Sequence, residues 1–303
     1  MASILRQQIA LRQIAPSTYT ADWHIDWTLG STLFGGSIAA IIHHVAATHI
    51  VTEPTLAARD QPDILSMHVE FLRSCERCQS TIIVSPLKIG ATASTIQLQL
   101  SQNGQLKAIA LATTTNFNKP LGPTVPTDWT LLDCINGPPH LLPPPPPPPN
   151  FDRILTRQPD DHWLPSRLSG DIIRYGCIDE TESMDATYLA MITDVIPLMS
   201  DTFLRNNGLY DAHAYRGKLE RWAKENPGIP AEITNSVAET MRATLYNNTI
   251  HTKVTAKMLH SGKISIDITM CNSEEEFVCT AHQLILILEA ERKFRPSKTE
   301  PVL

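Results

Sequence analysis

A proline-rich segment divides this chain near its middle. It runs from Pro120 to Asp161 and contains seven consecutive prolines, Pro143 to Pro149. Because proline fixes φ and has no backbone N–H to donate, such a run adopts coil or polyproline II structure rather than a helix or a central strand. A connection of this length inside one compact domain is uncommon. The sequence therefore predicts two folded units, residues 1–118 and 165–303, joined by a linker over residues 119–164.

One predicted helix and four predicted strands make up the first unit. Gly35-Gly36 opens the helix, whose apolar residues recur at helical spacing: Ile38, Ile41, Ile42, Val45 and Ala46. Strand-like segments follow at residues 64–73, 80–89, 92–102 and 105–117. Between the last two, Asn103-Gly104 is the dipeptide that most strongly indicates a two-residue hairpin.

The second unit repeats this plan. The sequence predicts a strand at 168–178, a helix at 184–205, and strands at 237–246, 250–259, 263–271 and 276–288. A polar stretch within residues 206–231 is typical of an inserted surface helix. One helix with antiparallel strands, twice over, indicates an α+β fold rather than alternating βαβ units. Neither helix is opened by a glycine-rich phosphate-binding motif, which disfavours a nucleotide-binding fold.

Charge and hydropathy exclude two classes of partner. The chain has 25 basic and 31 acidic residues and a net charge of -6, whereas nucleic-acid binders need a concentrated excess of Lys and Arg. No run approaches the ~18 apolar residues of a membrane helix. Arg6 and Arg12 interrupt the apolar N-terminus, where a secretory signal requires continuity. We therefore expect a cytoplasmic protein that binds neither nucleic acid nor membrane.

The sequence does not predict a metal or cofactor site. Cys75 and Cys78 form a C-x-x-C pair, but no second pair completes a zinc tetrahedron. His44 and His49 in the first helix lie on different faces, and no acidic ligand adjoins them. We expect reduced cysteines, no metal and no cofactor.

Three segments resemble acyl-CoA thioesterases of the double-hotdog type. Leu33 to Ala40 is similar to the Phe-Gly-Gly opening of their central helix, and Ser66 to Arg73 is similar to their His-x-x-Phe-Leu-Arg strand, although Ser74 replaces the proline that follows in the family. Ser101 to Gln105, followed by Ile109 to Ala112, resembles their final hairpin. Order and spacing agree over residues 10–118 and more loosely over 165–290. The proline-rich bridge resembles fungal members found beside polyketide synthases.

This resemblance implies an α+β double hotdog, in which each curved antiparallel sheet wraps a central helix. The two units then associate edge to edge, which removes one unpaired strand edge from each. The acyl chain of the substrate is expected between the units, so that neither unit works alone. Hotdog units commonly associate further, so the resemblance leaves open whether the protein forms a homo-oligomer.

The resemblance also implies a catalytic set of an Asp, a Gln and a hydroxyl residue that together activate a water molecule. Asp194 matches the aspartate of the second helix, although the proline that follows comes early, and Gln283 matches the glutamine of the last strand. Thr240 is the choice for the hydroxyl, with Thr234 and Ser236 as alternatives.

The residues themselves leave two interpretations for each position. Asp194 interrupts an apolar helix face, where burial would raise its pKa toward that of a general base, or it lies at the edge of that face and meets solvent. Gln283 is either catalytic or a structural amide, and Thr240 is either catalytic or an ordinary strand threonine. The N–H groups of Gly35 and Gly36 could face a developing oxyanion, or the glycines could serve close packing alone.

We also expect Phe34, Trp27 and His68, together with the two glycines, to bind the substrate. The predicted function is hydrolysis of an acyl thioester, carried by CoA or by a carrier protein, in fungal secondary metabolism such as polyketide biosynthesis. Two alternatives remain: a cyclase, dehydratase or lyase on the same scaffold, and a non-catalytic acyl-binding subunit.

Overall fold

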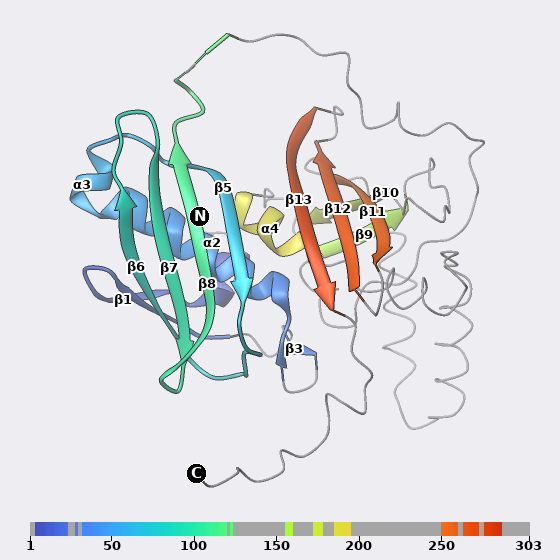
Figure 1. Ribbon diagram of the computed structural model, residues 1–303, viewed down its shortest axis with the longest axis horizontal. Helices are drawn as coiled ribbons and strands as arrows, with labels where there is room; N and C mark the ends of the chain where they lie inside the picture. Colours follow the sequence, from blue (N-terminus) through green and yellow to red (C-terminus); the bar gives the residue numbers. More distant parts are fainter. Residues whose placement is uncertain are drawn as a thin grey trace, which may run out of the picture.

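The computed structural model describes residues 4–23, 28–29, 32–119, 122–123, 155–159, 172–177, 185–194, 250–259, 263–272 and 276–286. These residues form two antiparallel sheets and the helices packed against them (Figure 1). All structural statements below refer to these parts of the chain.

The first sheet has six antiparallel strands in the order β1-β2-β6-β7-β8-β5. Two short strands, β1 (Arg12–Ala15) and β2 (Thr18–Ala21), precede the central helix α2 (Gly35–Thr52). After it come β5 (Asp63–Phe71), β6 (Ser80–Lys88), β7 (Ser94–Gln102) and β8 (Gln105–Thr115). The four predicted strands of this unit are therefore confirmed to within two residues at every end. The remaining elements are α1 (Ile4–Ile9), β3 (Thr28–Leu29), β4 (Thr32–Leu33) and α3 (Pro54–Ala57).

The hairpin between β7 and β8 shows why the local sequence predicts this sheet well. Residues of β7 alternate strictly between buried and half-buried, as expected of a strand with one face on a core. Asn103 and Gly104 both have positive φ, 49° and 73°, the combination that a tight two-residue hairpin requires.

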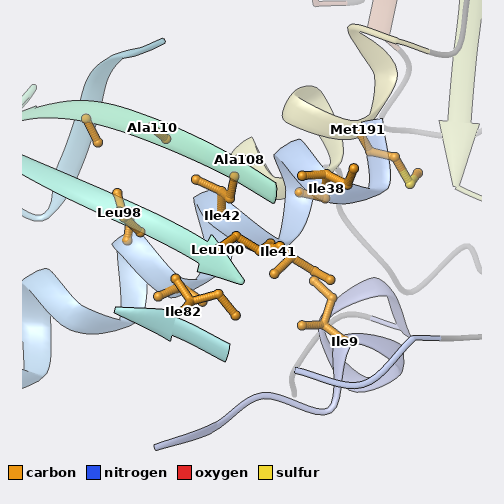
Figure 2. Packing of buried hydrophobic residues seen from close by; sticks show 14 of the residues in the cluster. Ile9, Ile38, Ile41, Ile42, Ile82, Leu98, Leu100, Ala108, Ala110 and Met191 are labelled. Atoms are coloured by element: carbon orange, nitrogen blue, oxygen red, sulfur yellow. The ribbon is translucent and has the colours of Figure 1, made fainter. Parts of the chain in front are cut away.

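Helix α2 is enclosed by apolar side chains along most of its length. Its isoleucines Ile38, Ile41 and Ile42 contact a layer contributed by the sheet, which Figure 2 shows from close by: Ile82, Leu98, Leu100, Ala108 and Ala110. All of these side chains are almost completely buried. A helix that is apolar on nearly every face belongs in the interior.

The second sheet has five antiparallel strands in the order β13-β12-β11-β10-β9. They are β9 (Leu155–Pro159), β10 (Ile172–Cys177), β11 (Ile250–Leu259), β12 (Lys263–Cys271) and β13 (Phe277–Leu286). The bounds of β11 and β12 coincide with the prediction. Ile266, Ile268 and Met270 of β12 belong to the same apolar cluster as the side chains around α2.

Strand β9 lies inside the segment predicted to be linker, so the second sheet begins before residue 165. Proline is concentrated elsewhere in that segment: residues 155–158 contain none, and Pro159 stands at the end of the strand. Because β9 is an edge strand, the missing N–H of Pro159 is tolerated.

Helix α4 (Ala186–Ile192) joins the two units. Its residues pack against α2, and the contacts Gly36–Asp194 and His43–Thr187 show that the two helices run in opposite directions. The helix was predicted over residues 184–205, of which 195–205 lie outside the described residues. The predicted strand 237–246 and the inserted segment 206–231 also lie outside them.

Candidate active site

The site begins at the N-terminus of α2. The first N–H groups of any helix have no partner within the helix, and Phe34, at the N-cap position, has no side-chain oxygen to accept from them. Asp194 supplies that oxygen from the other unit. Its Oδ2 accepts from the backbone N–H of Gly36 at 2.9 Å, and the N–H of Gly35 also donates to this carboxyl group.

Close approach explains why residues 35 and 36 are glycines. A Cβ atom on Gly35 would lie 2.5 Å from Asp194 Oδ2, and one on Gly36 would overlap the carbonyl oxygen of Met191. Any larger residue at either position would push α4 away from α2. The packing interpretation of these glycines is thus supported, and their N–H groups are occupied by Asp194.

The environment of Asp194 favours the protonated form of its side chain. The residue follows the last turn of α4, where its N–H donates to Met191 O at 3.3 Å, and its carboxyl group is enclosed between the helices. Burial raises the pKa of Asp194 from 3.8 to about 6, opposed by hydrogen bonds from Gly36, Gln283 and Gly35. A carboxyl group with this pKa can accept a proton near neutral pH.

Gln283 reaches the same place from β13. Its Nε2 donates to the carbonyl oxygen of Thr193 at 2.9 Å, and its side chain also hydrogen-bonds Asp194. Because a backbone carbonyl can only accept a hydrogen bond, the amide nitrogen of Gln283, and not its oxygen, must face Thr193 O. Both N–H groups are then used, one on Thr193 and one on the carboxylate, which leaves Oε1 as an acceptor.

The alternation of β13 places Gln283 on the inner side of its sheet. Residues 279, 281, 283 and 285 are half-buried, whereas 280, 282, 284 and 286 are exposed. Cys279, Ala281 and Ile285 share the side of Gln283 and pack against the core. The strand was predicted, but its pattern alone does not reveal that Thr193 lies opposite the amide.

Phe71 is a site residue that the sequence reasoning missed. The end of its ring, Cζ, lies 3.7 Å from the position of a Cβ on Gly35, and its side chain is 51% exposed. The signal was present, because Phe71 belongs to the segment that resembles His-x-x-Phe-Leu-Arg.

The structure does not bring His68 to this place. Met67 and Val69 face the core and Phe71 faces Gly35, so the two-residue period of β5 turns His68 to the other side of the sheet. There its side chain is 72% exposed and lies 3.7 Å from the carboxylate of Glu70. Phe34 is buried at the start of α2, next to the site. Trp27 and Thr240 lie outside the described residues.

Other titratable groups do not form a second chemical centre in the described residues. No group of three or more His, Cys, Asp and Glu side chains there is arranged to hold a metal ion. Burial lowers the pKa of both His43 and His44 to about 4, and His43 Nδ1 shares a hydrogen bond with Thr187 Oγ1 at 3.2 Å. No helix in this part of the chain is long and apolar enough to cross a membrane.

Part of the chain matches a known family. Residues 23–116 match the family described as the acyl-CoA thioesterase N-terminal domain. The thioesterase-like protein TwmA of the fungus Talaromyces wortmannii is 20% identical over 340 residues, which cover 96% of this chain and 94% of TwmA.

Solved structures share the architecture of the whole chain. The acyl-CoA thioesterase II TesB2 of Mycobacterium marinum is 14% identical, covers 94% of this chain and 99% of its own, and gives a TM-score of 0.59. A conserved hotdog-fold protein of Alicyclobacillus acidocaldarius is 12% identical, covers 95% and 99%, and gives 0.59. At such identities the likeness shows the fold, and the predicted α+β hotdog architecture is confirmed.

Proposed function

We propose that this chain hydrolyses acyl thioesters with a water molecule as the nucleophile; its match to the acyl-CoA thioesterase N-terminal domain and its hotdog fold support this proposal. One observation carries the proposal: a buried carboxyl group with a pKa of about 6, Asp194, is hydrogen-bonded to Gln283 where the two units meet. A carboxylate in that environment suits general-base chemistry at neutral pH.

The reaction follows from the donors and acceptors present. Asp194 takes a proton from water, and the hydroxide oxygen bonds to the thioester carbonyl carbon, giving a tetrahedral intermediate. When the C–S bond breaks, the electron pair leaves with sulfur, and Asp194 returns the proton to the thiolate. Gln283 Oε1 is the acceptor that can hold the second proton of the water, so that its oxygen points at the substrate.

A purely structural role for Asp194 is the strongest competing interpretation. The carboxylate caps α2, and helix caps alone stabilise proteins by about 1 kcal/mol. In that case the chain would bind acyl groups without hydrolysing them. The two roles separate experimentally, because asparagine caps helices as well as aspartate does but cannot act as a base.

The test is thiol release from a panel of acyl-CoAs by the wild type, Asp194→Asn and Asp194→Ala. We expect Asp194→Asn to lose at least about 10²-fold in kcat while its melting temperature does not fall below that of the wild type. Asp194→Ala should lose both turnover and stability. Asp185→Asn is the matched control, because Asp185 caps α4 by accepting from Thr187 N and Tyr188 N. Normal turnover by Asp194→Asn would remove the assignment.

The proposal also extends to the chemical class of the substrate. We propose a CoA- or carrier-bound acyl or polyketide chain, processed in the cytoplasm of a fungus. The proline-rich bridge and the Talaromyces relative support this context. A panel of short, long, aromatic and β-keto thioesters, offered on CoA and on a carrier protein, tests it by the preference in kcat/KM.

A further inference from the structure

Lys107 occupies an unusual position on β8. In the pairing with β7, Leu100 lies opposite Ala108 and Ser101 lies opposite Leu106, so Lys107 is the extra residue of a β-bulge. A bulge turns two consecutive side chains to one side of a sheet. Ala108 is completely buried and Lys107 is only 8% exposed, which places both on the helix-facing side.

The charge of Lys107 has no carboxylate partner in the described residues. Its Nζ donates to the neutral amide oxygen of Gln105 at 3.3 Å, and no described Asp or Glu lies within ion-pair distance. A largely buried ammonium group is costly unless an anion accompanies it. This part of the molecule is therefore arranged to receive a negative charge.

Arg73 lies beside Lys107. Met67, Val69 and Phe71 alternate on the inner side of β5, and the same period puts Arg73 on that side just past the strand. Its backbone N–H donates to Lys107 O at 3.1 Å, and its guanidinium donates to Leu106 O at 2.9 Å.

Arg77 follows in the loop of residues 72–79, which contains one carboxylate, Glu76. Arg73 and Arg77 are exposed, and in the described part of the chain neither pairs with a carboxylate. Cys75, in the same loop, is buried. Burial raises the pKa of its thiol to about 11, and the charge of Lys107 opposes that rise.

This group of cations adjoins the catalytic candidate. Cys75 O accepts from Leu33 N at 2.9 Å, and Glu76 forms a β-bridge with Thr32, so the loop is fixed to β4, directly ahead of Gly35. Phe71 contacts the Gly35 position, and Arg73 lies only two residues, about 7 Å of strand, beyond Phe71. The positive end of the α2 dipole adds to the local potential.

We propose that Lys107, Arg73 and Arg77 bind the phosphate of the phosphopantetheine arm that carries the acyl group. This inference rests on the proposed thioester hydrolysis and extends it to the leaving group. The arm phosphate is common to CoA and to carrier proteins. An arginine binds phosphate oxygens through its planar fork of N–H groups, and lysine contributes a point charge.

The positions of these cationic side chains favour a phosphate as their ligand over a carboxylate on the acyl chain. The arginines lie at the strand ends and are exposed, where a hydrated, multiply charged group can stay in contact with water. The core that the site adjoins is apolar. A carboxylated acyl chain is therefore the rival ligand that the experiment separates.

The experiment compares one acyl group on three thiols: CoA, 4′-phosphopantetheine and pantetheine, of which only the last lacks the arm phosphate. The variants are Lys107→Met, which keeps the apolar stem, and Arg73→Gln. Lys88→Met is the control, since Lys88 is exposed at the opposite end of the sheet. We expect each test variant to raise KM for the two phosphate-bearing substrates about tenfold or more, with kcat and the pantetheine substrate unchanged.

Binding separates this inference from the proposed function. Calorimetric titration with free CoA and with free pantetheine needs no turnover, so it reports on the subsite even if no thioester is cleaved. Wild type should prefer CoA, and Lys107→Met and Arg73→Gln should each lose that preference. Three outcomes would each overturn the proposal. The variants could lose as much affinity for pantetheine as for CoA, or their effect could distinguish only CoA from 4′-phosphopantetheine. The loss could also depend on whether the acyl chain carries a carboxylate. If Lys107→Met does not fold, the exposed Arg73→Gln and Arg77→Gln decide the matter.

The last comparison is between an acyl-CoA and the same acyl group on a carrier protein, which has the same arm phosphate. Lys107→Met should impair an acyl-carrier protein and an acyl-CoA to a similar degree, because the arm phosphate is shared. Impairment of neither would contradict the assignment.

Discussion

Two opposing influences act on the Asp194 carboxyl group. Enclosure between α2 and α4 disfavours its ionised form, while hydrogen bonds from Gly36, Gln283 and Gly35 favour it. Burial prevails, and the pKa of Asp194 rises to about 6. Asp194 is thus partly protonated at mildly acidic pH and ionised above neutrality.

This shift predicts the pH dependence of turnover. Only the ionised carboxylate can accept a proton, so kcat/KM should rise with pH and level off above an apparent pKa near 6. The residual activity of Asp194→Asn should lack this inflection. A wild-type profile that is flat between pH 5 and 8 would contradict the role of Asp194 as base.

Stability should change in the opposite sense over an overlapping range. The folded pKa of about 6 exceeds the ordinary value of 3.8, so between these values the folded state binds more protons than the unfolded state. The free energy of unfolding should therefore fall as pH rises from about 4 to 6, by at most about 3 kcal/mol. Denaturant titrations of wild type and Asp194→Asn measure this, and the variant should show a smaller fall.

The glycines permit a second residue-level prediction. In Gly35→Ala the new methyl group would collide with Asp194 Oδ2, so we expect turnover to fall at least about tenfold. Gly104→Ala is the control: no atom of the described residues lies within 4 Å of its Cβ position, but φ is +73°, so stability should drop by about 1 kcal/mol with turnover unchanged. Equal turnover in the two variants would show that the contact with Asp194 is unimportant.

At the level of elements, α4 ends just before Asp194 and is fixed at its start by contacts remote from the site. Asp185 caps it through Thr187 N at 2.8 Å and Tyr188 N at 3.2 Å. The other oxygen of Asp185 lies 2.7 Å from Arg6 Nε of α1. An element only seven residues long depends on such contacts for its orientation.

Removal of the cap should therefore lower both the stability of the protein and its turnover. We expect Asp185→Ala to lose about 1 kcal/mol of stability and several-fold in kcat, because α4 frays and Asp194 moves. Asp185→Asn keeps the cap and loses only the partly exposed ion pair, so it should behave nearly as the wild type. Thermal unfolding and thiol release distinguish these outcomes, and wild-type turnover by Asp185→Ala would contradict the argument.

Strands were predictable to different degrees for a physical reason. β7 and β8 are joined by a turn whose backbone conformation only certain residues adopt, and burial alternates regularly along β7. β9 is a short edge strand in a proline-rich stretch, and its existence depends on pairing with β10. Local pattern cannot report a partner that lies elsewhere in the chain.

For the whole molecule, the site depends on both units at once. The glycine N–H groups come from α2, the carboxylate from Asp194 just past the end of α4, and the amide from β13. α4 packs on α2, and buried residues of β12 join the core around α2. We expect these contacts, rather than the covalent connection, to hold the site together.

Cleavage of the chain between the units tests this directly. With a protease site in place of Pro143 to Pro149, cutting the folded protein should leave the two pieces associated and turnover within a few-fold of the uncut protein. Size-exclusion chromatography and the thiol-release assay measure both. Separation of the pieces with loss of turnover would show that the connection itself maintains the site.

The amino-acid sequence by itself determined the periodic elements: the α2 stripe, the strands from β5 to β8, and β11 to β13. Hydrophobic period and turn chemistry are local properties, so they can be read from neighbouring residues. Resemblance supplied Asp194 and Gln283 as candidates.

Only the tertiary structure decided what those candidates meet. The bond from Gly36 to Asp194 joins residues 158 positions apart, and the bond from Gln283 to Thr193 spans 90. The tertiary structure also places Phe71, and not His68, beside Gly35, and it places Lys107 on the inner side of the sheet with no carboxylate partner among the described residues. Burial, and with it the raised pKa of Asp194, results from packing between distant segments, which no local pattern encodes.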